Sequence, residues 1–186
     1  MSVEAQTDPS NRPRYPSVSI NTKSPSHLFI VEGEPSEAMN ALYESVPDDC
    51  KKHLLTIGTK SDGAGIDPVA VSTDTLLLLL AEALPSTAVY LEGSEAFMWD
   101  MNVLATKQGM VAEQINMLPP TSNKRRLFCT HCYTIMEDVT HTPAVCSGCG
   151  LNLLVRDHFS RLHAAYVGVQ IDGEDPADLP EPEELR

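Results

Sequence analysis

Four of the five cysteines stand in two closely spaced pairs. The pairs are Cys129-x2-Cys132 and Cys146-x2-Cys149, and 13 residues separate them. A C-x2-C turn places two sulfurs on one side of a tight knuckle, and two facing knuckles form a tetrahedral site with no open position. The sequence therefore predicts that these four cysteines bind one metal ion, in the manner of a zinc ribbon.

The spacing leaves the identity of the metal open. Tetrahedral thiolate sites suit both zinc and iron, so zinc is the expected metal and a rubredoxin-like iron is the alternative. Disulfides are not expected, because the first residues show no export signal. His131 and His141 lie in the same segment, but four sulfurs already complete the coordination, so we expect both outside it. Cys50 follows two aspartates and is predicted to be an ordinary thiol.

Residues 27–120 alternate between short apolar runs and stretches with helical spacing, which predicts an α/β domain with a parallel sheet flanked by helices. Ser36 and Ser94 stand where helix N-caps are expected, and Gly109 where a helix ends. The predicted strands span residues 27–31, 54–58, 88–93 and 111–118, and the predicted helices span residues 36–46, 73–84 and 95–108.

One segment of this domain resembles a known nucleotide-binding family. Residues 90–98, Tyr-Leu-Glu-Gly-Ser-Glu-Ala-Phe-Met, are similar to a strand–turn–helix near the end of the nicotinamide-binding domain of ferredoxin-type reductases. That family's glycine-rich pyrophosphate loop is replaced here by residues 32–37, which hold Glu32, Glu34 and Glu37. Carboxylates oppose phosphate and can themselves satisfy the amides of a helix N-terminus. We therefore expect a degenerate domain that has lost its nucleotide, with no cofactor-binding residue.

The segment after the cysteines carries helical spacing and several charged side chains. Apolar residues recur from Phe159 to Tyr166, Asp157 stands in an N-cap position, and Gly168 follows. We predict a C-terminal helix that packs on the ribbon. The neighbouring charged residues lack a nucleophile, so no catalytic residue is expected. The candidate partner-docking residues are Arg156, His158 and Arg161.

Charge and composition limit the classes of partner. The chain has 26 acidic and 13 basic residues, a net charge of −13, which disfavours nucleic acid and anionic membranes as partners. No apolar run reaches the roughly 18 residues of a membrane span, and we expect a cytoplasmic protein. The predicted divisions are a flexible N-terminal arm (1–26), the α/β domain (27–120), a four-cysteine module with its helix (121–168), and an acidic disordered tail (169–186).

The cysteine module resembles a specific family. Phe-Cys-Thr-His-Cys at 128–132, Cys-Ser-Gly-Cys-Gly at 146–150 and Val-Arg-Asp-His-Phe-Ser-Arg at 155–161 are similar to the C-terminal module of the small subunit of bacterial dimethylamine monooxygenase. The degenerate reductase-like domain also fits that subunit, so the resemblance extends over residues 27–168.

The resemblance implies a multi-subunit, NADPH-dependent oxygenase that converts dimethylamine to methylamine and formaldehyde. It places haem on an oxygenase subunit, and flavin and [2Fe–2S] on a reductase subunit. This chain would be an accessory subunit that docks or organises those partners; the alternative is an electron-relay subunit with iron in the cysteine site. A nucleic-acid-binding regulator is a third hypothesis, which the acidic net charge opposes.

Overall fold

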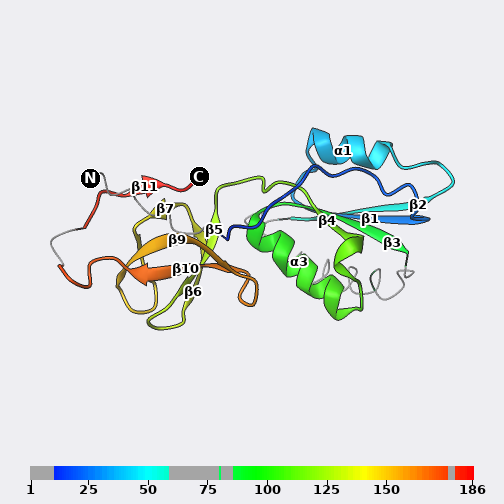
Figure 1. The fold of residues 1–186 in the computed structure, drawn as a ribbon. Helices are drawn as coiled ribbons and strands as arrows, with labels where there is room; N and C mark the ends of the chain where they lie inside the picture. Colours follow the sequence, from blue (N-terminus) through cyan, green and yellow to red (C-terminus); the bar gives the residue numbers. More distant parts are fainter. Residues whose placement is uncertain (1–10, 59–79, 81–85, 176–178) are drawn as a thin grey trace, which may run out of the picture. The chain divides into compact units, whose positions relative to one another are not determined.

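The computed structural model describes residues 11–58, 80, 86–175 and 179–186 (Figure 1). The chain divides into two units. We call Tyr15–Ser122 the α/β unit, and Asn123–Arg186 together with the N-terminal segment up to Arg14 the ribbon unit. Among the described residues, none of the helices has the length and apolar character needed to cross a membrane.

The α/β unit contains a parallel sheet with strand order β2-β1-β3-β4, which confirms the predicted parallel sheet. The predicted helix over residues 73–84 lies outside the described residues, apart from Leu80. The last predicted strand is shortened because a 3-10 turn precedes it. The elements are β1 (Ser26–Glu32), α1 (Glu37–Glu44), β2 (Lys51–Ile57), β3 (Thr87–Glu92), α3 (Glu95–Lys107), η1 (Ala112–Gln114) and β4 (Ile115–Met117).

Side chains of β1 and β3 are buried on both faces of the sheet, as expected of central parallel strands. On one face Ile30 packs with Met98 of α3, and on the other Phe29 packs with Met39 of α1. Figure 1 shows the two helices on opposite faces of the sheet. The side chains of Ser36 and Ser94 cap the two helices, as predicted.

Residues 15–26, predicted as part of a flexible arm over residues 1–26, contact the rest of the α/β unit. The Tyr15 hydroxyl donates to Glu95 Oε1 at 2.6 Å, and the indole Nε1 of Trp99 donates to the same hydroxyl oxygen at 3.2 Å. Val18 and Ile20 pack against the core beside α1. Three apolar side chains, spaced too irregularly to form a period, therefore anchor this segment without secondary structure.

The ribbon unit contains a five-stranded sheet with order β6-β5-β10-β9-β8, and a second pairing of β11 with β7. β10 runs parallel to β5, and the other pairs are antiparallel. Its strands are β5 (Arg125–Cys129), β6 (Ile135–Val139), β7 (His141–Thr142), β8 (Ala144–Val145), β9 (Asn152–Ser160), β10 (Ala165–Gln170) and β11 (Glu183–Glu184).

The predicted C-terminal helix is wrong, because residues 152–170 form the antiparallel pair β9 and β10. Phe159 pairs with Tyr166 across the two strands, with ring centroids 5.1 Å apart. Leu162, expected on the same helical face, is 88% exposed in the turn between the strands. A helix places residues seven apart on one face, about 10 Å apart along its axis, whereas this hairpin places them directly opposite each other. The β-branched and aromatic content of the segment favours strands.

The predicted disordered tail also needs correction at both ends. Val169 and Gln170 belong to β10, and Glu183 pairs with Thr142 of β7. Leu185 is 7% exposed, and its backbone N–H donates to the Thr140 carbonyl at 2.8 Å. The tail thus supplies a strand to β7 and an apolar anchor, which its acidic, proline-rich composition does not indicate.

Candidate metal centre

The two cysteine pairs sit in knuckles with the same backbone hydrogen bonds. In the first, Tyr133 N donates to the Cys129 carbonyl and Cys129 N donates to the Thr134 carbonyl. In the second, Gly150 N and Cys146 N make the equivalent bonds, at 2.9 Å each. The residue after each pair has positive φ, 64° at Tyr133 and 75° at Gly150.

The four sulfurs fit a tetrahedral metal ion. The Sγ atoms lie within 4.8 Å of one another, with Cys129 to Cys149 at 3.9 Å and Cys132 to Cys146 at 3.6 Å. A metal–sulfur bond of about 2.3 Å gives a tetrahedral edge of about 3.8 Å, close to these two separations, so the cluster could hold a metal ion. Zinc and iron give the same edge, and the geometry leaves the choice between them open.

Groups around the knuckles shift the pKa values of two of the four thiols. Hydrogen bonds from the Thr134 side chain and backbone lower the pKa of Cys132 to about 6. At Cys149 the Leu151 N–H acts in the same direction, but desolvation and the neighbouring sulfurs outweigh it and raise the pKa to about 12. The cluster thus favours one thiolate and holds another thiol protonated, so a metal that takes four thiolates releases protons when it binds.

Both the cysteine module and the chain as a whole are similar to known proteins. Residues 126–169 match the family described as "Dimethylamine monooxygenase subunit DmmA-like, C-terminal domain". The delta subunit of a heme-dependent oxidative N-demethylase from Ectopseudomonas mendocina (strain ymp) is 32% identical over 180 residues, which cover 95% of this chain and 97% of that protein. The chain belongs to the DmmA-like family. This confirms the family predicted from the cysteine module, and no solved structure matches the chain.

In this DmmA-like chain, the remaining candidate ligands lie outside the sulfur cluster. Among the described residues, the only group with metal-site spacing is the four cysteines. His131 and His141 are exposed, and His141 Nδ1 instead lies 2.9 Å from the Thr140 hydroxyl. Cys50 is half-buried in the α/β unit, with its sulfur 3.6 Å from the Ser24 carbonyl.

The predicted docking residues lie on a bulge and a turn. Tyr166 pairs with Phe159 and Gly168 with Val155, so residues 156–158 of β9 stand opposite one residue of β10. Bulges of this kind redirect side chains and are common beside functional sites. Arg156 is half-buried on this bulge. His158 and Arg161 are exposed.

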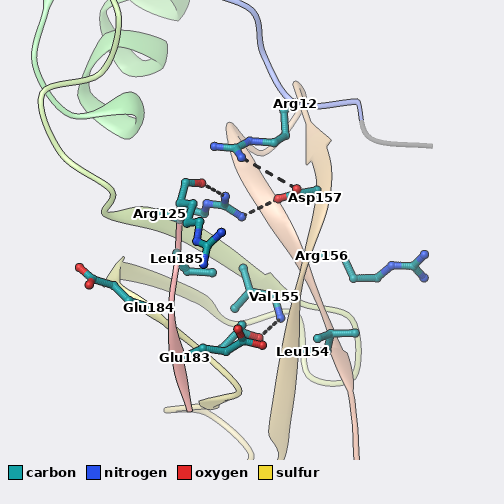
Figure 2. Close-up of a pocket in the computed structure, with 11 residues that line it drawn as sticks. Arg12, Arg125, Leu154, Val155, Arg156, Asp157, Glu183, Glu184 and Leu185 are labelled. Atoms are coloured by element: carbon teal, nitrogen blue, oxygen red, sulfur yellow. Dashed lines mark hydrogen bonds and ion pairs between the residues drawn. The ribbon is translucent and has the colours of Figure 1, made fainter. Parts of the chain in front are cut away.

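Sequence reasoning missed a polar groove of about 630 Å³ in the ribbon unit, beside the bulge (Figure 2). Arg125 is 5% exposed and donates to Asp157 Oδ1 at 2.9 Å and to the Arg186 carbonyl at 2.7 Å. Its guanidinium also lies 4.3 Å from the ring centroid of Tyr166. Arg125 therefore links the bulge to the C-terminal segment. These partners are 32 and 61 residues away in sequence, too far for any local pattern to indicate.

The α/β unit offers a second place where a ligand is expected. The strand order β2-β1-β3-β4 has its switch point between β1 and β3, because the chain adds β2 on one side of β1 and β3 on the other. Ligands of such sheets bind at the carboxyl ends of the strands beside the switch point. Here Glu32, the last residue of β1, accepts the Ser94 N–H at 2.6 Å. Glu92, the last residue of β3, accepts the Ser36 N–H at 3.0 Å and also its hydroxyl.

Each glutamate thus bonds the helix that follows the other strand: Glu32 of β1 caps α3, and Glu92 of β3 caps α1. A carboxylate does accept from the amide at the start of α1, as expected, but it belongs to Glu92 and not to residues 32–37, whose Glu32 serves α3 instead. Glu92 is 3% exposed. Gly93, with φ of 154°, fits beneath Glu32, because a Cβ at Gly93 would lie 2.6 Å from Glu32 Cβ.

Proposed function

We propose that this chain is a non-catalytic accessory subunit of a cytoplasmic, NADPH-dependent oxygenase that converts dimethylamine to methylamine and formaldehyde. Haem, flavin and [2Fe–2S] reside on the oxygenase and reductase subunits, and this chain docks or organises them. Membership of the DmmA-like family supports an accessory role, since the similar protein from Ectopseudomonas mendocina is named as a subunit of an oxidative N-demethylase.

The observation that carries the proposal is the closed sulfur tetrahedron. Cys129, Cys132, Cys146 and Cys149 supply all four ligands that a tetrahedral ion takes, so substrate would find no open position on the metal. We assign zinc to this site. The ion joins the first knuckle to the second and so stabilises the fold of the ribbon unit.

The α/β unit supports the same proposal. Glu32 and Glu92 accept hydrogen bonds from the helix N-terminal amides beside the carboxyl ends of the strands, and a dinucleotide phosphate would need those amides. Carboxylates there repel phosphate, so the unit serves as a folded scaffold and leaves NADPH to the reductase subunit.

An electron relay with iron in the same site is the second candidate. The sulfur separations of 3.6 and 3.9 Å suit iron as well as zinc, and Cys132 and Cys149 are half-buried, within reach of a docked electron donor. This candidate predicts a coloured protein that the reductase subunit reduces.

The experiment that tests the proposal replaces Cys146 by serine in the complete complex. We expect the complex to lose this chain, because the second knuckle no longer holds the metal. Cys50→Ser is the matched control, since Cys50 lies in the other unit, and it should assemble normally. An intact Cys146→Ser complex that no longer turns over would contradict the scaffold role and favour the relay.

A further inference from the structure

The outer face of the ribbon sheet carries a row of apolar side chains that crosses three strands. Ile135 of β6 stands opposite Phe128 of β5, and Phe128 stands opposite Val167 of β10. Ile135 is 44% exposed, and Leu154 of β9, on the same face one row away, is 36% exposed. Their neighbours along each strand face inward and are buried, so the row lies on the face away from the core.

Two turns extend this row. The His163 ring stacks on Phe128 with centroids 4.5 Å apart, and the Tyr133 ring lies 5.9 Å from Phe128. Tyr133 is 72% exposed, and Leu162, the neighbour of His163, is 88% exposed. Isolated exposed apolar residues are ordinary, but a continuous group of them on one face marks an interaction surface.

Cations stand at the edge of this face. Figure 2 shows the side chains of Leu154 and Arg156 pointing to the side opposite Asp157. Arg161 is exposed in the turn beside Leu162. Residues 121–168 hold five Lys or Arg and three Asp or Glu, a net charge of +2, whereas residues 169–186 of the same unit hold one base and seven acids, a net charge of −6. The positive charge is therefore local to the cysteine segment, where Arg156 and Arg161 favour a partner surface that carries carboxylates.

We propose that this docking face, defined as Phe128, Ile135, Leu162 and Val167 edged by Arg156 and Arg161, binds another subunit of the enzyme through an apolar surface edged by carboxylates. The proposal rests on the proposed accessory function and assigns that function to one surface. The apolar row supplies the buried centre of the contact, and the two arginines set its orientation and speed of association. It also gives a place to Arg156 and Arg161, which the metal centre does not use.

The test compares three variants in the complete complex, with affinity for the remaining subunits measured by titration. Ile135→Glu combined with Leu162→Glu places two charges in the centre of the face, and we expect affinity to fall by at least about tenfold. Arg161→Glu should slow association and weaken its dependence on salt. Val111→Glu is the matched control, because Val111 is 54% exposed in the α/β unit, and it should bind as the unaltered chain does.

Three results would overturn the proposal. Unchanged affinity of the double variant, with this chain still in the complex, would refute the docking face and leave the accessory function standing. Self-association of the purified chain that the double variant abolishes would assign the face to a second copy. A melting temperature that falls in the double variant, but not in the other two variants, would show that the face packs within the chain. Failure of the unaltered chain to bind any other subunit would instead refute the accessory function itself.

Discussion

Gly148 belongs to the second knuckle and faces Thr134 and Cys132 of the first, so its replacement by alanine tests the metal centre without replacing a ligand. A Cβ there would lie 2.1 Å from Thr134 Oγ1, 2.9 Å from Thr134 Cβ and 3.1 Å from Cys132 Sγ. Thr134 cannot simply move away, because its hydroxyl lies 3.2 Å from Cys132 Sγ and lowers the pKa of that thiol. The added methyl group therefore separates the knuckles or breaks this hydrogen bond.

The expected effect follows from the size of such a clash. Overpacking by one methyl group typically destabilises by about 1–3 kcal/mol. The strain exists only when the knuckles are closed around the metal, so it appears as a loss of metal affinity of about five- to 150-fold. The assay is competition with a chromophoric zinc chelator at constant pH, together with thermal unfolding in excess zinc.

Two further variants separate the causes. Gly173→Ala in the same unit is the control, because a Cβ at Gly173 meets only Gln170 at 3.6 Å or more. Thr134→Ala removes the hydrogen bond without a clash, so the pKa of Cys132 should rise and affinity should fall less than in Gly148→Ala. Metal affinity in Gly148→Ala within twofold of Gly173→Ala would refute the closed geometry of the two knuckles.

Three other predictions concern stability. Arg125→Met leaves Asp157 without its close cation and should lower the free energy of unfolding in urea by about 1–3 kcal/mol, whereas Lys124→Met, which breaks an exposed pair, should change it by less than about 1 kcal/mol; equal effects would contradict this role of Arg125. Glu92→Ala removes an acceptor from the start of α1 and should destabilise by about 1–3 kcal/mol in the same assay, and an unchanged value would show that its bonds contribute nothing. Burial lowers the pKa of His27 below its ordinary value of 6.5, against the opposing effect of its hydrogen bond to the Ser24 backbone. The unfolded chain therefore takes up a proton before the folded chain does, and stability should fall as pH drops below about 6.5. Urea unfolding of His27→Phe should lack this decline, and a parallel decline would assign it to other groups.

The parts of the structure that local patterns determine could be predicted from the sequence. The cysteine spacing indicated the S4 cluster, and apolar runs with serine caps indicated β1, α1, β3 and α3. The segment from Phe159 to Tyr166 fits both a helix, which places these two residues on one face, and a hairpin, which places them opposite each other. Either structure buries Phe159 and Tyr166, so the exposure of Leu162 is what separates the two, and that exposure depends on the rest of the sheet.

The long-range contacts could not be predicted, because no local pattern encodes them. Leu185 is buried through a strand pairing with β7, more than 40 residues away. Glu92 stands beside Ser36 only because β1 and β3 are neighbours in the sheet. The sequence indicates carboxylates near the first helix. That Glu92 is the one bonded to Ser36 depends on the strand order.

We propose that the four cysteines hold a structural zinc ion in a subunit that organises others. Elemental analysis and a visible spectrum of the chain, expressed alone and purified without added metal, test it most directly. We expect about one zinc per chain and no visible absorption bands. Iron with thiolate charge-transfer bands would contradict it, and would make reduction by the reductase subunit the next property to measure.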